Sequence, residues 1–295
     1  MTLPLVVGVD GSEPALRAVD WAVDEAVRHG LPLRIVHASL WERFEAEALA
    51  DTSGVAADVV TEHALAQSVV ANATQRAKRR GPMLEISTDV VPADAASALL
   101  QEARRATAVV TGVRGRGPIR ELLLGSASLS LAARSPCPVV VVRGRTENRE
   151  AANGRVVVGV GTPATSAAAV RFAGRAAAVR GCALEAVRVW RRPAHKVAPH
   201  PLLVGEPAHY QEDHAAALLD DALNHLAEEY PGLAVHRALV EGSARQVLLA
   251  RSAASDLLVI GARRRHGHLG PQLGLVGHAV LHHADCPVAL VPQQA

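Results

Sequence analysis

One loop in the first half of the chain carries glycines at a spacing suited to holding a phosphate group. The segment 112–126 reads GVRGRGPIRELLLGS, with glycine at positions 112, 115, 117 and 125 and with Ser126 directly after the last. A phosphate needs several backbone N–H groups pointed at one spot, and glycines let the backbone come close. A helix that begins at Gly125 and Ser126 adds free N–H groups and a partial positive charge. The segment therefore predicts a phosphate-binding loop.

The same loop carries arginines that could cover a polyphosphate, at positions 114, 116 and 120, although such side chains could equally face solvent. No GK[ST] follows the glycines, so the loop is not a Walker A motif. A dinucleotide GxGxxG would follow the first strand, which this loop does not. The simplest alternative is a turn that binds nothing, but motif, spacing and context together favour phosphate binding.

Other residues that could do chemistry give weaker signals. His278 and His282 stand four apart on an expected helix, but no third ligand is placed by spacing, so we predict no metal site. Cys137 and Cys286 precede the last strand of each half and are expected to be buried structural thiols. Glu121 is the one carboxylate inside the loop, and a single acid does not make an active site, so no catalytic residue is predicted.

Strands and helices alternate along the first half. Apolar runs and helical periodicity predict strands at 5–9, 33–36, 84–90, 108–111 and 139–142, and helices at 15–28, 58–80, 93–105 and 126–134. This alternation predicts an α/β fold with a doubly wound parallel sheet, in which ligands bind at the carboxyl ends of the strands.

The pattern then repeats. The segment VVGVDGS at 6–12 returns as VVGVGTP at 157–163, VVTG at 109–112 returns as LVIG at 258–261, and PCPVV at 136–140 meets DCPVA at 285–289. The chain is therefore predicted to hold two tandem copies of one domain, at 1–146 and 154–295. The polar segment RGRTENREAAN at 143–153 is expected to be the linker.

Composition excludes several classes of protein. Apolar residues make up 49% of the chain and aromatic residues only 2%, so the cores should be built of Val, Leu, Ile and Ala. The net charge of +2 and the scarce aromatics argue against a nucleic-acid partner. Three cysteines without a CxxC fit reduced thiols. With neither a signal-peptide pattern nor an apolar run of about 20 residues, we expect a cytoplasmic protein without a membrane partner.

These motifs resemble those of the universal stress protein family. Its nucleotide loop has the form Gly, two residues, Gly, nine residues, Gly-Ser/Thr, which Gly112, Gly115, Gly125 and Ser126 match. The opening GVDGS and the closing PCPVVVV are also similar to the family. Because the likeness spans both halves, the chain resembles a tandem member, and the implied fold is the adenine nucleotide α-hydrolase-like fold.

The resemblance implies an ATP site in the first half. In ATP-binding members the residue matching Asp10 faces the adenosine, with the residue matching Gly8 beside it, and the backbone near Ala38 meets the adenine. From the residues alone, Gly8 and Ala38 could be ordinary strand-end residues. From the residues alone, Asp10 could instead be a turn residue or a helix N-cap. The remaining implied contacts are Gly112 to the ribose and the loop to the phosphates. The predicted site therefore comprises Gly8, Asp10, Ala38, Gly112, Arg114, Gly115, Arg116, Gly117, Gly125 and Ser126.

The second half departs from the family pattern at three positions. Gly161 stands where Asp10 is matched, Arg264 where Gly115 is, and Leu275 where Ser126 is. Gly159, Gly261 and Gly274 are retained. We therefore predict that the second half does not bind ATP as the first does, although the basic run at 263–266 leaves binding of an anion by charge open.

The functional prediction is an ATP-binding universal stress protein, with or without Mg²⁺, that acts as a nucleotide-dependent regulator in stress response. A weak ATP-hydrolysing or phosphotransfer enzyme and a protein-interaction module are the alternatives. The final strands at 139–142 and 288–291 are short and apolar. Exposed edges of that kind tend to pair, which predicts a homo-oligomer or an internal pseudo-dimer.

Overall fold

The computed structural model describes residues 2–39, 55–113, 125–192, 207–262, 265–267 and 270–293. The chain divides into two compact units, 1–143 and 144–295, and each is described by itself.

The described residues of the first unit form five parallel strands. Their order across the sheet is β3-β2-β1-β4-β5, and the strands are β1 (Leu5–Val9), β2 (Leu33–Ala38), β3 (Ile86–Val91), β4 (Ala108–Gly112) and β5 (Val139–Val142). All four residues of β5 are buried, as the apolar sequence VVVV requires.

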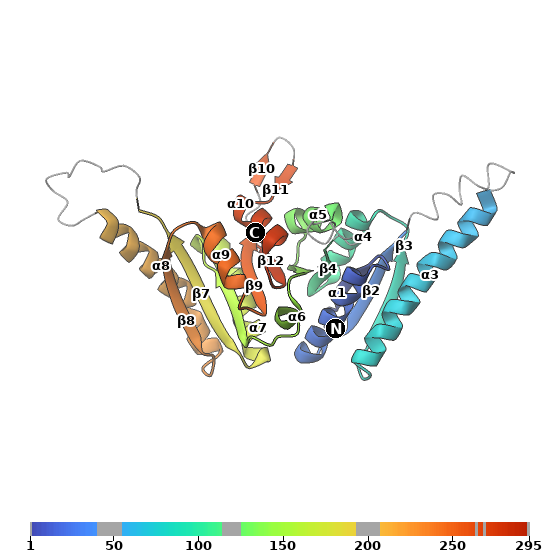
Figure 1. Cartoon of the computed structure of the whole chain (residues 1–295), viewed down its shortest axis with the longest axis horizontal. Helices are drawn as coiled ribbons and strands as arrows, with labels where there is room; N and C mark the ends of the chain where they lie inside the picture. Colours follow the sequence, from blue (N-terminus) through green and yellow to red (C-terminus); the bar gives the residue numbers. More distant parts are fainter. Residues whose placement is uncertain are drawn as a thin grey trace. The chain divides into compact units, whose positions relative to one another are not determined.

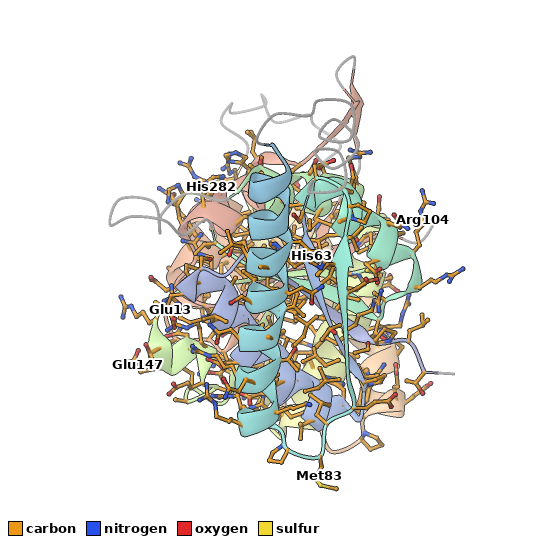
Figure 2. The ribbon with its side chains drawn as sticks, turned by 90° about the vertical axis from the view of Figure 1, so that its right-hand side faces the viewer. Glu13, His63, Met83, Arg104, Glu147 and His282 are labelled. Atoms are coloured by element: carbon orange, nitrogen blue, oxygen red, sulfur yellow. The ribbon has the colours of Figure 1, made fainter. Side chains whose placement is uncertain are left out.

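Helices cover both faces of this sheet. They are α1 (Glu13–His29), α3 (Val55–Arg80), α4 (Ala95–Glu102) and α5 (Ser126–Arg134). Helix α1 packs with α3, and α4 packs with α5. Figure 2 shows α3 in front of the sheet, with Met83 at the turn that follows it. The predicted doubly wound α/β fold is confirmed. One expected helix, 93–105, is divided into α4 and the 3₁₀ turn Ala103–Arg105.

The ends of α1 follow from its sequence. Ser12 is the N-cap, and its hydroxyl accepts a hydrogen bond from the N–H of Ala15 at 3.4 Å. Pro14 occupies the first turn, where its missing N–H costs nothing. The helix ends at Gly30, whose φ of 61° is the left-handed conformation that glycine adopts without strain. These signals place the start of α1 directly after β1.

The second unit repeats this plan. Its parallel strands lie in the order β8-β7-β6-β9-β12, and they are β6 (Arg155–Gly159), β7 (Ala183–Trp190), β8 (Val235–Glu241), β9 (Leu257–Ala262) and β12 (Val288–Pro292). Its helices are α6 (Thr146–Arg149), α7 (Pro163–Arg180), α8 (Pro207–Glu229), α9 (Ala244–Ser252) and α10 (Leu275–His283) (Figure 1). An antiparallel hairpin of β10 (Arg265–Gly267) and β11 (Gly270–Gln272) precedes α10.

The segment expected to be a linker is largely ordered against the second unit. Asn148 on α6 is 2% exposed, and its side-chain amide donates to the carbonyl oxygens of Ser252, Ala253 and Ser255 at 2.9, 3.1 and 2.9 Å. The N–H of Arg145 donates to the carbonyl of Asp285 at 3.0 Å. Polar groups of this segment therefore form specific hydrogen bonds within the second unit.

The winding direction reverses between β1 and β4 in the first unit and between β6 and β9 in the second. From β1 the chain winds outward through β2 and β3, and it returns to pair β4 with the other side of β1. Ligands of doubly wound sheets bind at the carboxyl ends of strands beside such a reversal. No helix of the described residues is long and apolar enough to cross a bilayer.

Candidate functional site

A pocket of about 240 Å³ lies at the carboxyl ends of β1, β2 and β4, against the first turn of α5. The described members of the predicted site all line it: Gly8, Asp10, Ala38, Gly112, Gly125 and Ser126. The other four, at positions 114 to 117, lie outside the described residues. Three strand ends and one helix start thus bring together side chains more than 100 residues apart in sequence.

Asp10 occupies the turn between β1 and α1. Its Oδ1 accepts hydrogen bonds from the N–H and the hydroxyl of Ser12, at 3.0 and 2.5 Å. Asp10 is therefore a turn residue, and Ser12 is the N-cap. The carboxylate is also exposed in the pocket, and its Oδ2 accepts no hydrogen bond from any described residue. The turn fixes the carboxylate and leaves one oxygen available to a ligand.

The first turn of α5 faces the pocket without a side-chain cap. Gly125 is the N-cap, with φ −66° and ψ 151°, and no side chain accepts a hydrogen bond there. The exposed Ser126 follows at the first helical position. The first N–H groups of a helix have no partner within the helix, and they carry partial positive charge. This arrangement suits an anion such as phosphate.

Two buried hydroxyls hold α5 against β4. The hydroxyls of Thr111 and Ser128 lie 3.1 Å apart, and Ser128 also donates to the carbonyl of Gly112 at 3.4 Å. Both side chains are about 5% exposed or less. Since β4 and α5 flank the Gly112–Ser126 loop, this contact fixes the distance between the two ends of the loop.

Gly112 has a packing reason to be glycine. A Cβ at this position would stand 2.5 Å from the carbonyl oxygen of Pro14 and 3.0 Å from the nitrogen of Ala15. The end of β4 thus lies directly against the first turn of α1, where no side chain fits. Glycine at 112 would be required whether or not a nucleotide binds.

The pocket also holds residues that the sequence analysis did not select. They are Val36, His37, Ala95, Leu99, Thr111 and Ser128, among others. His37 is one such residue, and its Nδ1 lies 2.8 Å from the carbonyl oxygen of Val9. The position of His37 opposite Val9 follows from the β1–β2 register, which an alignment of the two strands in the sequence could have supplied.

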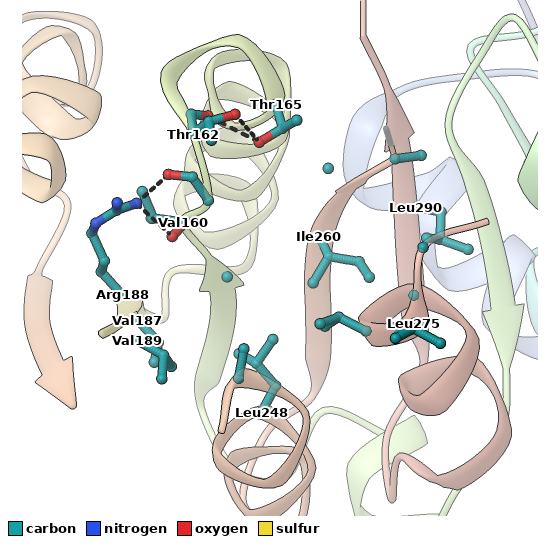
Figure 3. Close-up of a pocket in the computed structure, with 18 of the residues that line it drawn as sticks. Val160, Thr162, Thr165, Val187, Arg188, Val189, Leu248, Ile260, Leu275 and Leu290 are labelled. Atoms are coloured by element: carbon teal, nitrogen blue, oxygen red, sulfur yellow. Dashed lines mark hydrogen bonds between the residues drawn. The ribbon is translucent and has the colours of Figure 1, made fainter. Parts of the chain in front are cut away.

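A second pocket, of about 490 Å³, lies at the equivalent place in the second unit (Figure 3). It is bounded by the ends of β6, β7 and β9 and by the first turn of α10. The registers define the equivalence: Val6 pairs with Val109 in one unit, and Val157 pairs with Leu258 in the other. The fold therefore presents the same pocket position twice.

The family model that describes the universal stress protein family matches residues 1–143 and 152–292. The chain belongs to the universal stress protein family. Its sequence is 30% identical over 289 residues to a universal stress protein of Mycolicibacterium smegmatis, covering 97% of this chain and 96% of that protein. It is also 30% identical over 298 residues to one of Mycobacterium tuberculosis, covering 98% and 97% of the two chains. The recognition from sequence is confirmed.

The fold is similar to that of solved universal stress proteins. The crystal structure of one from Archaeoglobus fulgidus superposes with a TM-score of 0.66 at 15% identity, covering 99% of this chain and 96% of that one. Within the described part of this universal stress protein, no group of three or more His, Cys, Asp or Glu side chains is arranged to hold a metal ion.

The second pocket of this universal stress protein has a different lining. In chain order, the first-unit residues Asp10, His37, Thr111, Ser126 and Ser128 are matched by Gly161, Arg188, Ile260, Leu275 and Gly277. At these five positions one carboxylate and three hydroxyls are lost and one guanidinium is gained, while Thr162 and Thr165 also line the second pocket. Leu275 is 89% exposed at the first position of α10, where it offers no hydrogen bond.

Gly261 of the second unit, which matches Gly112, has the same packing constraint. A Cβ at Gly261 would collide with the carbonyl oxygen of Thr165, as one at Gly112 would collide with that of Pro14. Because this close approach occurs in both units, the presence of Gly261 carries no information about a nucleotide. The residues that differ between the pockets are those whose side chains a ligand would meet.

Proposed function

We propose that this universal stress protein binds ATP in its first unit and acts as a cytoplasmic, nucleotide-dependent regulator in stress response. The observation that carries the proposal is the first-unit pocket, which is lined both by the uncapped start of α5 and by the carboxylate of Asp10. An anion-binding helix start and a hydrogen-bond acceptor in the wall of one pocket suit a ligand with a phosphate end and a nucleoside end.

In this proposal the adenosine lies at the ends of β1 and β2. The free Oδ2 of Asp10 accepts a hydrogen bond from the nucleoside, and the backbone near Ala38 meets the adenine. Small residues support this role, because Ala38 leaves room at the end of β2, while a Cβ at Gly8 would already stand 2.8 Å from Cδ1 of Leu99, which lines the same pocket.

The phosphates lie at the start of α5 in this proposal. The N–H groups that follow Gly125 and the hydroxyl of Ser126 donate to phosphate oxygens. The loop residues Arg114, Gly115, Arg116 and Gly117 complete the phosphate site, and a bound Mg²⁺ would supply charge neutralisation there. ATP binding then shifts the population of shapes or the affinity for a partner, which is the regulatory step.

We infer that the second unit does not hold ATP in the same way. Gly161 provides no side-chain acceptor for the nucleoside, and Leu275 provides no hydroxyl for a phosphate. Binding rather than hydrolysis is proposed for the first unit, because Asp10 is the one carboxylate in its described lining and Ser12 already holds one oxygen of it.

The test is to purify the whole chain without added nucleotide, denature it, and identify the released small molecules by chromatography and mass spectrometry. We expect ATP at close to one equivalent per chain. Two equivalents would contradict the difference between the units. If no nucleotide is released and none binds to the purified chain at micromolar ATP, the proposed function is wrong.

A further inference from the structure

The second-unit pocket is an apolar hollow with few polar groups. Its wall is formed mainly by aliphatic side chains from β9, β12, α9 and the start of α10, including Leu248, Ile260, Leu273, Leu275, Val276 and Leu290 (Figure 3). Its volume of about 490 Å³ falls in the range of small-molecule sites, which are mostly apolar with a few placed polar groups. The lining suits the apolar body of a ligand.

Among the described residues that line this pocket, the charged one is Arg188, near the end of β7. Figure 3 shows its guanidinium beside Val160, with hydrogen bonds from Nη1 to two backbone carbonyls. These acceptors are the carbonyl of Val160, at 3.2 Å, and that of Gly161. Because carbonyls are neutral, this contact positions the guanidinium and leaves its charge uncompensated.

Among the residues that the structure describes, no acidic side chain balances that charge. Burial lowers the pKa of Arg188 below its ordinary value, and no carboxylate contributes to raise it again. The Nε atom of Arg188 is buried and has no hydrogen-bond partner. Leaving a buried donor without a partner is unfavourable, so an additional acceptor beside this guanidinium would be favourable.

Other arginines of this chain show how a guanidinium group binds a carboxylate. The edge formed by Nε and Nη2 binds both carboxylate oxygens of Asp20 in Arg76, at 2.9 and 2.6 Å, and both oxygens of Asp24 in Arg80, at 2.7 and 2.8 Å. Arg34 uses the same edge on Glu102. This side-on geometry is the one in which a guanidinium matches a carboxylate. In Arg188 it is Nη1 that bonds the two carbonyls, and no described residue accepts a hydrogen bond from Nη2.

The charge of the pocket is thus inverted relative to the first unit. Asp10 contributes a negative charge there, whereas Gly161 and Arg188 together leave one positive charge here. We propose that the second-unit pocket binds a small organic carboxylate with an apolar body, its carboxylate beside the guanidinium of Arg188 and its body against the aliphatic wall. This site goes beyond the proposed ATP site and does not depend on it.

The test uses octanoate as the probe and 1-octanol as its uncharged match, each titrated calorimetrically into the whole chain. We expect octanoate to bind at one equivalent, at least tenfold more tightly than 1-octanol. Arg188→Gln should weaken octanoate binding at least tenfold and leave 1-octanol within twofold. Arg191→Gln is the matched control, because Arg191 also donates to a backbone carbonyl, that of Gly242 at 3.0 Å, and does not line the pocket.

Two further variants locate the site. Leu275→Ser changes an exposed side chain and should weaken both probes several-fold without unfolding the chain. Ser126→Leu alters the first unit only and should leave octanoate binding unchanged, so a failure of the ATP proposal is distinguishable from a failure of this one. Equal octanoate affinity in the parent and in Arg188→Gln, equal losses in Arg188→Gln and Arg191→Gln, or no binding at millimolar octanoate would each overturn the proposal.

Discussion

The carboxylate of Asp10 accepts hydrogen bonds from both the N–H and the hydroxyl of Ser12, at 3.0 and 2.5 Å. Ser12 in turn caps α1 by accepting from the N–H of Ala15. One short polar segment therefore starts the helix and also fixes a carboxylate at the pocket. The second unit keeps the helix start but has Gly161 in place of the carboxylate, so the two roles are separable.

Two replacements of Asp10 distinguish the role of its negative charge from its role as the hydrogen-bond acceptor in the turn. Asp10→Asn keeps an oxygen that can accept from Ser12, whereas Asp10→Gly copies the second unit and removes every side-chain acceptor. We expect the affinity for ATP to fall about tenfold or more in Asp10→Gly, the scale of one hydrogen bond to a charged group, and to fall less in Asp10→Asn. Because Asp10 is proposed to face the nucleoside, titration with adenosine should show losses of the same size. Unchanged ATP affinity in Asp10→Gly would remove Asp10 from the site.

Gly112→Ala tests the close approach of β4 to α1. The added Cβ would stand 2.5 Å from the carbonyl oxygen of Pro14, which is backbone and has little room to move. We expect the free energy of unfolding to fall by about 1–3 kcal/mol, as for other overpacked sites. Gly232→Ala is the control, since nothing lies within 4 Å of a Cβ there, and it should change stability by less than about 0.5 kcal/mol. Urea unfolding measures the free energy of unfolding of both variants. Equal values for the two would contradict the proposed close packing at Gly112.

Asn148→Ala tests whether the segment between the repeats is part of the second unit. Its loss would leave the carbonyls of Ser252, Ala253 and Ser255 without the amide that they share. We expect a cost of about 1–3 kcal/mol in the unfolding transition of the second unit. The neighbouring Glu147 is exposed, so Glu147→Ala should have little effect. A linker that only connects the units would tolerate both changes equally.

Cys137 should be a slow-reacting thiol. Burial raises the pKa of Cys137, so the reactive thiolate is scarce in the native protein. Because the native pKa lies above the unfolded one, the associated stability is present below the unfolded pKa and is lost as pH rises through the native pKa. At pH 8 iodoacetamide should label Cys137 more slowly than the partly exposed Cys182. Peptide mapping measures both rates, and faster labelling of Cys137 in the native chain would contradict this.

Local signals in the sequence were sufficient for much of the fold. The bounds of α5 and β5 are found where the sequence predicts them, because a Gly-Ser start and an unbroken run of valines are local signals. The internal repeat in the sequence was sufficient to predict the second unit. Six residues of the predicted site line one pocket, while their contacts with a nucleotide stay a prediction.

The rest depends on contacts that no local pattern contains. Asn148 bonds carbonyls 104, 105 and 107 residues away, and its polar surroundings show no periodicity that would mark a buried side chain. Likewise His37 and Arg188 enter the pockets because of strand register, which places each one beside the end of a neighbouring strand. The loss of the carboxylate at Gly161 could be read from the sequence, but the added charge of Arg188 could not be assigned to the pocket until the strand registers were known.

The central claim is that the first unit alone carries the ATP site, and calorimetric titration of the purified, nucleotide-free whole chain tests it most directly. We predict one ATP per chain, with affinity reduced at least tenfold by Ser126→Leu, which copies the second unit into the first. The reciprocal Leu275→Ser, at the matched position of α10, should leave ATP binding unchanged. Two ATP per chain, or a loss of binding in Leu275→Ser with none in Ser126→Leu, would contradict the claim.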